Sequence, residues 1–187
     1  YDAGDFITEM TTPYGTTSFV KEEGPGPYRS LETRYPLGEK ERVEFKEQAP
    51  GIGISEFNFP QGMGLINNYL IYRNTFYWDK KAMKEAPGDY TKAKIYHWLH
   101  GSAGTGESNV ASPMLESIKQ PFENRVWFNY QGQQPPYYSA NQGMSSRPAV
   151  TGRVLDDGST QLSKVYYNTS GRDSITIDPA GRQFSYF

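Results

Sequence analysis

The chain has 187 residues, a formal net charge of -2, 36% hydrophobic and 15% aromatic residues, and no cysteine. Lysine and arginine are spread along the chain without a basic patch, which gives no electrostatic footprint for nucleic acid, and the lack of cysteine excludes disulfides and thiolate metal sites. No apolar run approaches the roughly 20 residues that a membrane-spanning helix needs. The aromatic content argues against disorder and suits a broad tyrosine-rich sheet with little dry core.

Residues 1–50 are predicted to be short strands joined by turns. Tyr1-Asp2 stands eleven residues before Thr12-Pro13-Tyr14-Gly15, and further turns are expected at Gly24-Pro25-Gly26-Pro27 and Tyr35-Pro36-Leu37-Gly38. Proline presets the geometry of such turns and glycine accepts a positive φ. The alternation in Arg42-Val43-Glu44-Phe45 is typical of a half-buried strand.

Residues 51–150 have a less regular pattern. The residues over 79–86 are largely good helix formers and Pro87-Gly88 stops them, which predicts one short helix. We expect strands over residues 69–77, 93–100 and 125–130, and loops over 101–113 and 131–148.

Regular signals return over residues 151–187. A hairpin is predicted around Asp156-Asp157-Gly158-Ser159, with strands at 162–167, 173–177 and 183–187. Tyr167-Asn168 is followed four residues on by Gly171-Arg172 and eleven residues on by Asp178-Pro179-Ala180-Gly181-Arg182. This spacing repeats the tyrosine-to-turn distance of the N-terminal stretch, so the chain is expected to be part of an array whose units cannot bury their apolar faces alone.

These motifs resemble those of Rhs, or YD-repeat, proteins, most closely at the two ends of the chain. The matching stretches are Tyr1-Asp2, Tyr35-Pro36-Leu37-Gly38-Glu39, Gly152 to Thr160, Tyr167-Asn168 with Gly171-Arg172, and Asp178 to Arg182. Asn168 stands where the family has the aspartate of its YD pair, and the family's self-cleaving closing segment has no match here. The middle stretch resembles the less repetitive parts of large bacterial members.

The resemblance implies an all-β fold, in which antiparallel strands and hairpins build a sheet that spirals into a hollow shell with stacked YD tyrosines. Bacterial shells of this family enclose a C-terminal toxin, and the related barrels of animal teneurins act in cell-surface adhesion. The expected partners are therefore neighbouring YD repeats of a longer parent chain and an enclosed polypeptide, and the expected location is secreted or at the cell surface. The missing start methionine agrees with a piece cut from such a chain. The residues expected to carry the architecture are Tyr1, Asp2, Pro13, Gly15, Pro36, Gly38, Gly158, Tyr167, Gly171, Arg172, Asp178, Pro179, Gly181 and Tyr186.

Three sequence patterns resemble a binding or catalytic site, but each is better explained as an ordinary structural feature of a loop, strand or turn. The stretch Gly101 to Ser108 has the glycine spacing of a phosphate-binding loop, but Glu107 stands where the lysine is needed, so a surface loop is expected. His97 and His100, the two histidines of the chain, should be half-buried among aromatic residues and face opposite ways on a strand. The carboxylate pairs Glu22-Glu23 and Asp156-Asp157 are expected in turns, solvated or capping their own backbone. No metal, cofactor or catalytic site is predicted.

The aromatic side chains can have either of two roles. In the first, they stabilise the sheet by packing across neighbouring strands. In the second, they form a platform on which sugar rings stack, with Trp98, Trp127, Tyr137 and Tyr138 as candidate ligand-binding residues. The whole chain, residues 1–187, is thus predicted to be a single non-enzymatic segment of a YD-repeat shell around a cargo polypeptide, and the alternative is a surface module that binds glycan or protein.

Overall fold

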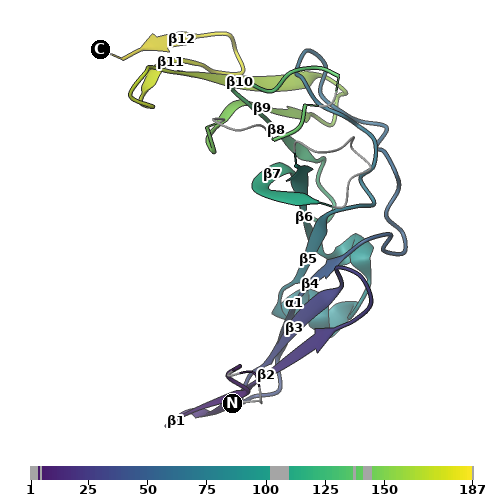
Figure 1. The fold of residues 1–187 in the computed structure, drawn as a ribbon. Coiled ribbons are helices and arrows are strands. Elements are labelled where there is room, and N and C mark those ends of the chain that lie inside the picture. Colours follow the sequence, from purple (N-terminus) through teal and green to yellow (C-terminus); the bar gives the residue numbers. More distant parts are fainter. Residues whose placement is uncertain (1–3, 5, 102–109, 137, 141–144, 187) are drawn as a thin grey trace.

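The computed structural model describes residues 4, 6–101, 110–136, 138–140 and 145–186, and over these ranges the fold is all-β. Twelve strands form a single sheet in the order of the sequence, each antiparallel to the next (Figure 1). The sheet is not closed, because β1 and β12 are its two edges. The strands are β1 Glu9–Thr12, β2 Gly15–Glu23, β3 Arg29–Arg34, β4 Lys40–Lys46, β5 Asn74–Trp78, β6 Lys94–His100, β7 Ala111–Lys119, β8 Val126–Tyr130, β9 Pro148–Val154, β10 Thr160–Tyr167, β11 Asp173–Ile177 and β12 Gln183–Ser185.

The predicted turns and the predicted helix are confirmed. Each of the three N-terminal turns joins two strands, and the hairpin at 156–159 joins β9 to β10. The helix α1 (Lys80–Glu85) begins at Asp79, whose side chain accepts the amide of Ala82, and a short 3-10 turn, η1 (Tyr90–Lys92), follows it. No helix in the described part of the chain is long and apolar enough to cross a membrane.

Two predicted boundaries are wrong. The strand expected over 69–77 starts only at Asn74, because Tyr69 and Arg73 have positive φ angles of 62° and 55° and turn the chain before it enters the sheet. The loop expected over 101–113 overlaps β7, which begins at Ala111; residues 102–109 lie outside the described part. The first residues of β7 are small or polar and lack the apolar alternation that predicts a strand. They join the sheet because of pairing with the neighbouring strand, not because of their own strand propensity.

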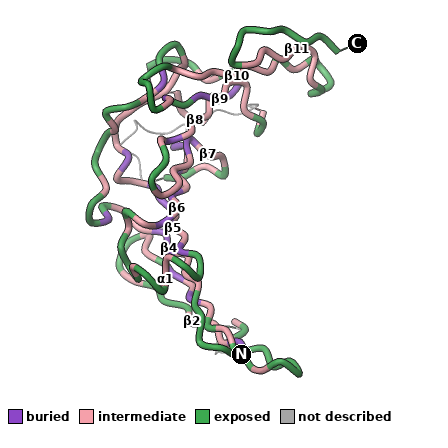
Figure 2. Tube along the Cα trace, turned by 180° about the vertical axis from the view of Figure 1, so that it is seen from behind, coloured by how far each residue is buried: buried purple, intermediate pink, exposed green. Residues whose placement is uncertain are grey.

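The sheet bends into an arch with one covered face (Figures 1 and 2). On the convex side lie α1 and a long connection, residues 47–73, which we call the cover segment; we call this side the outer face and the concave side the inner face. The core sits between sheet and cover on the outer face, where Phe76, Trp78 and Ile95 are buried against Ala82 and Met83 of α1.

Register fixes which side chains share each face. One outer-face row crosses seven strands and is closely packed at Gly152, where an added Cβ would meet Met63 and Pro60 of the cover segment at 2.7 and 3.2 Å. The members of this row, in strand order, are Lys46, Asn74, His97, Ser117, Trp127, Gly152 and Leu162.

Candidate functional site

One turn unit recurs at four of the hairpins. In each, the fourth residue is a glycine of positive φ whose amide donates to the carbonyl of the first residue, while the amide of the first donates to the carbonyl of the fifth. The four turns are Tyr35 to Glu39, Leu155 to Ser159, Asn168 to Arg172 and Asp178 to Arg182. The repeat seen in the sequence is therefore a hairpin turn of one geometry, and Gly38, Gly158, Gly171 and Gly181 share one position in it.

The side chains of Asn168 and Asp178 accept equivalent backbone amides in successive turns. The Asn168 Oδ1 accepts the amides of Ser170 and Arg172, each at 3.0 Å, and the Asp178 Oδ1 accepts those of Ala180 and Arg182 at 3.0 and 2.9 Å. The Asp178 carboxylate also pairs with the Arg182 guanidinium at 2.7 Å. These bonds, led by the Arg182 amide, lower the pKa of Asp178.

The first turn does not belong to this set. Thr12 pairs directly with Gly15, so only Pro13 and Tyr14 connect β1 to β2, and Gly15 has a φ of 120°. The side chain of Thr12 does accept the amide of Tyr14, two residues on, as Asn168 and Asp178 do in their turns. The sequence likeness between Thr12-Pro13-Tyr14-Gly15 and the later turns thus overstates the structural likeness.

The tyrosines of the motif lie at the C-terminal end of the sheet. Tyr167 closes β10 and donates to the Pro148 carbonyl at 2.7 Å, while the Arg147 guanidinium stands 4.6 Å from its ring centroid. Tyr186 follows β12, is 54% exposed, and its hydroxyl lies 3.3 Å from Thr176 Oγ1. Tyr1 and Asp2, the first pair of the motif, lie outside the described residues.

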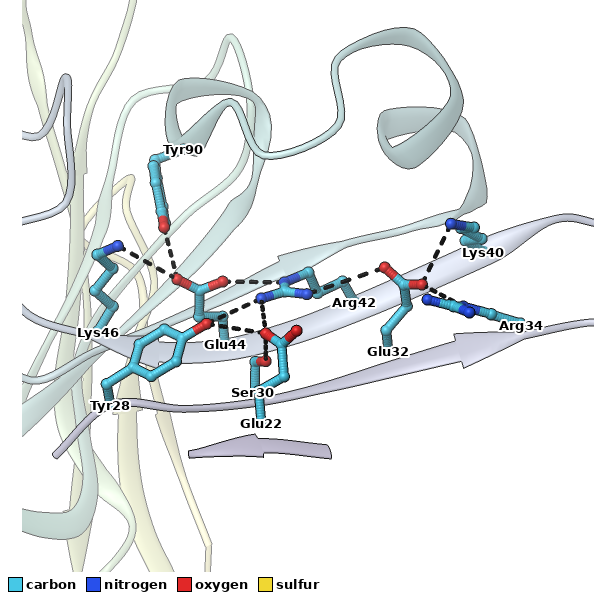
Figure 3. Close-up of polar contacts among 10 residues, drawn as sticks. All are labelled: Glu22, Tyr28, Ser30, Glu32, Arg34, Lys40, Arg42, Glu44, Lys46 and Tyr90. Carbon is cyan, nitrogen blue, oxygen red and sulfur yellow. Dashed lines mark hydrogen bonds and ion pairs between the residues drawn. The ribbon is translucent and has the colours of Figure 1, made fainter. Parts of the chain in front are cut away.

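A ladder of alternating charges crosses β2, β3 and β4 on the outer face (Figure 3). Arg42 is its centre: its guanidinium lies 3.0 Å from Glu44, 3.0 Å from Glu22 and 4.0 Å from Glu32. Glu32 also pairs with Arg34 and Lys40. The polar residues of the alternating stretch Arg42-Val43-Glu44-Phe45 therefore do not form a solvent-exposed face of β4, because the Glu44 side chain is only 4% exposed.

The pKa values of this ladder follow its contacts. The Arg42 hydrogen bond lowers the pKa of Glu22. Burial raises the pKa of Glu32, but Arg34 and Lys40 outweigh it and the net shift is downward. Burial, followed by the hydrogen bond to Glu44 at 2.6 Å, raises the pKa of Tyr90. The contacts of the ladder fasten three strands and η1 to one another.

A second polar group, which we call the His97 cluster, is enclosed between the sheet and the cover segment. His97 is 0% exposed; its Nδ1 lies 2.9 Å from Asn74 Oδ1 and its Nε2 lies 3.2 Å from Glu116 Oε2. Arg73 reaches in from the end of the cover segment, with Nη2 3.5 Å from both His97 Nε2 and Glu116 Oε2. These four residues are the His97 cluster.

A β-bulge places Glu116 in this cluster. His97 pairs with Ser117 and Trp98 pairs with Leu115, so Glu116 is the extra residue on β7. A bulge turns a side chain away from the face that strict alternation would give it. The expectation of half-buried histidines is wrong, because both rings are fully buried.

The inner face carries a row of side chains that are mostly partly exposed. Across β3 to β8, the register aligns Arg29, Phe45, Thr75, Tyr96, Ile118 and Val126, of which Phe45 is buried. Leu31 and Val43, together with Phe45, line a cavity of about 260 Å³. Neither α1 nor the cover segment lies on this side (Figure 1). The described part of the inner face is thus broad, mixed in polarity and free of a helical layer.

The four candidate ligand-binding aromatics do not form one platform. Trp127 is 0% exposed, which leaves no face for a sugar ring. Trp98 lies on the inner side, where its indole donates to Thr75 Oγ1 at 2.8 Å, whereas Tyr138 packs against Gly64 of the cover segment. Tyr137 lies outside the described residues, as does most of the glycine-rich stretch 101–108.

The remaining candidates show no assembled chemistry. Glu22 and Glu23 lie at the end of β2 rather than in a turn, whereas Asp156 and Asp157 lie in the turn after β9, as predicted. A cavity of about 570 Å³ opens between α1 and the β7–β8 turn, where the Lys92 ammonium stands 4.2 Å from the ring centroid of the exposed Phe122. Within the described ranges, no three His, Asp or Glu residues gather closely enough to hold a metal ion.

Sequence reasoning missed the residues that the fold brings together in the His97 cluster. Arg73, Asn74 and Glu116 are separated by up to 43 positions and carry no common motif. The one available signal was a polar run within the expected strand at 69–77.

A scan against models of protein families and a search of curated proteins both find no match to this chain.

Proposed function

We propose that this chain is a non-enzymatic wall segment of a YD-repeat shell, secreted or displayed at the cell surface, that encloses a cargo polypeptide. The observation that carries the proposal is the topology: a meander that adds each strand beside the previous one and, within the described residues, gives β1 and β12 one neighbouring strand each. Such a sheet can be lengthened at either end by the same hairpin unit, and an open edge is a template for pairing.

The two faces of the arch support the same role. The outer face is fastened by the charge ladder and the cover segment, whereas the inner face leaves a row of apolar and aromatic side chains partly exposed. A wall needs this division, with cohesion on one side and a contact surface on the other. Neighbouring repeats would pair with β1 and β12, and the cargo would lie against the inner row.

A test of the edges follows from the hydrogen-bonding pattern. The Phe19 amide donates to the Thr8 carbonyl at 2.8 Å, so bonded pairs alternate along β1 and the amides of Glu9 and Thr11 point outward. On the other edge, Tyr186 donates to Ser174 and Asp178 donates to Arg182, which turns the amide of Ser185 outward.

Light scattering over a range of concentrations would measure association of the purified chain. We expect the wild-type chain to associate, and the double variant Glu9→Pro with Ser185→Pro to stay monomeric at unchanged melting temperature, because each proline removes an outward donor only. Met10→Pro, which removes an inward donor, is the matched control that should lower stability and leave association in place. A wild-type chain that is monomeric at every concentration would contradict the wall role.

The enclosing role needs its own measurement. A fluorescently labelled, chemically unfolded polypeptide is the probe, and its anisotropy in the presence of the chain is the readout. Tyr96→Glu on the inner row should abolish binding, whereas Lys164→Glu on the outer face should not. Equal effects of the two variants, or no binding to the wild type, would leave a structural segment without a cargo role.

A further inference from the structure

A small cavity on the outer face lies between the sheet and the first part of the cover segment. It is lined by residues 51–53 and Glu56 of the cover segment and, from the sheet side, by Ile95, Lys119 and Arg125. We call it the Arg125 cavity. Its volume of about 210 Å³ is below the roughly 300 to 1,000 Å³ of pockets for drug-sized ligands, so an occupant must be small.

Two cationic side chains lie next to each other at this cavity. The strands β7 and β8 pair through Ile118 and Val126, and continuing this register by one residue places Lys119 opposite Arg125. Like charges directly opposite each other on a sheet are destabilising. An anion between the two side chains removes this repulsion.

The cavity wall carries more positive than negative charge. Arg125 Nε and Nη2 lie 3.0 and 2.9 Å from Glu56 Oε1, and Lys119 Nζ lies 3.5 Å from the same oxygen. These three are the charged residues of the lining, so two positive charges face one negative charge and the formal sum is +1. The Arg125 side chain is 2% exposed and that of Glu56 is 21% exposed, so water screens this excess charge only in part.

Arg125 has hydrogen-bond donors to spare for a ligand. Each terminal nitrogen of a guanidinium carries a pair of N–H groups. Within the described part of the chain, Nη2 contacts Glu56, and Nη1 donates to Ser117 Oγ at 3.0 Å. One N–H group on each terminal nitrogen is therefore left over at a buried position, where such groups almost always have a partner.

The rest of the lining includes apolar side chains. Ala93 and Ile95 are buried, and Ile52 of the cover segment lies at the cavity with them. Gly51 has a positive φ of 79°, and a Cβ added to it would stand 2.9 Å from Thr91 Cγ2, so this glycine lets the cover segment approach η1 closely. The cavity thus offers a short hydrocarbon group an apolar surface beside the two cations.

We propose that the Arg125 cavity binds a small aliphatic carboxylate, either a free acid or the C-terminal residue of a polypeptide. The carboxylate accepts from Arg125 and Lys119, its single charge brings the formal charge of the lining to zero, and its hydrocarbon part lies against Ile52 and Ile95. Hydrogen bonds between arginine and a carboxylate are charge-assisted and about twice as strong as neutral ones. A phosphate group, with a charge of about -1.5 to -2 near neutral pH, would exceed the charge of the lining. The site lies on the outer face and does not depend on the cargo role of the inner face.

Titration of the ¹⁵N-labelled chain at low salt, followed through amide chemical shifts, tests the proposal. The probes are isovalerate, as a free acid, and N-acetyl-Gly-Gly-Leu, as a polypeptide C-terminus. We expect saturable shifts at the amides of Gly51, Gly53 and Ala93, which line the cavity, and none at Gly158 in a distant turn.

Neutral probes of the same shape isolate the role of the charge. Isovaleramide and the amidated peptide should bind at least about tenfold more weakly than the acids, which is the difference between a charged and a neutral hydrogen bond. Tighter binding of the peptide acid than of isovalerate assigns the ligand as a polypeptide terminus, and binding of isovalerate alone assigns it as a free acid. Inorganic phosphate that binds as tightly as isovalerate would overturn the carboxylate assignment.

Paired variants locate the binding site. Lys119→Gln removes a cation whose side chain is 34% exposed, so the fold should persist while isovalerate binds about tenfold more weakly and isovaleramide is unaffected. Lys92→Gln is the matched control, because Lys92 is also half-buried but does not line this cavity. Equal losses in the two variants overturn the proposal. So does a wild-type chain that shows no saturable shifts at the lining amides, or that binds acid and amide equally.

Discussion

Gly15 and Pro36 are in contact across one end of the sheet: a Cβ added to Gly15 would stand 2.6 Å from the Cβ of Pro36. Gly15 begins β2, and Pro36 lies in the turn between β3 and β4, so two hairpin ends interlock. Gly38, in the same turn as Pro36, also has a positive φ but has no neighbouring atom within 4 Å of its absent Cβ. The two glycines therefore separate the effect of packing from that of backbone conformation.

Gly15→Ala should destabilise the chain more than Gly38→Ala. The alanine at 38 bears only the cost of a positive φ, about 1 to 2 kcal/mol, and the alanine at 15 adds an overpacking cost of about 1 to 3 kcal/mol. Urea unfolding of both variants measures the difference. Pro36→Gly, combined with Gly15→Ala, should recover the packing part, and equal losses in the two single variants would show that the contact is immaterial.

Asp178 should make the last turn sensitive to acid. Its pKa is lowered in the folded chain, so its contribution is present above the ordinary aspartate pKa and is lost as pH falls through the folded value. Thermal melts between pH 7 and pH 2 should show a smaller acid loss for Asp178→Asn, which keeps the two amide contacts without the charge.

The reverse substitution at the preceding turn, Asn168→Asp, should raise stability at neutral pH. Asn168→Asp creates the Tyr-Asp pair of the motif and places a carboxylate where two amides already converge. We expect this variant to melt slightly higher than the wild type at pH 7 and to lose the gain in acid. A lower melting temperature at pH 7 would show that the two turns are not equivalent.

The sequence predicted the hairpins because their information is local. Proline and glycine at fixed offsets define a turn wherever the chain goes, so the turns at Pro36, Gly158 and Gly181 were found without knowledge of the sheet. The helix at 79–86 was found for the same reason, since a run of helix-forming residues ends at Pro87-Gly88.

The arrangement of charges was not accessible in this way. Arg42 and Glu44 look like the solvent side of β4, and contacts with distant segments, such as the hydrogen bond from Tyr90 of η1 to Glu44, cover them. Glu116 joins His97 through a bulge, and a one-residue irregularity of this kind has no sequence signature in a polar strand. What the sequence missed therefore depends on contacts between distant segments.

The charge ladder should be fragile at Arg42. Removing its guanidinium in Arg42→Met leaves the buried Glu44 without its closest cationic partner, and we expect a loss of about 2 to 4 kcal/mol. Arg153→Met removes an exposed arginine that bonds Gln161 and should change stability by less than about 0.5 kcal/mol. Equal losses of stability in Arg42→Met and Arg153→Met would mean that Arg42 contributes no more to stability than an exposed surface arginine.

Gly152 should be needed for the cover segment to lie flat on the sheet. A Cβ at this position would stand 2.6 Å from Leu162 Cδ2 and 2.7 Å from Met63 Sδ. Because both of these are ends of flexible side chains, Gly152→Ala should cost about 1 to 3 kcal/mol without unfolding the chain. The loss should appear as faster amide exchange in the cover segment, for instance at Leu70, whose amide donates to the Ile54 carbonyl. Met63→Ala in the same variant should restore protection. Slow exchange at Leu70 in Gly152→Ala alone would show that the cover segment does not depend on this contact.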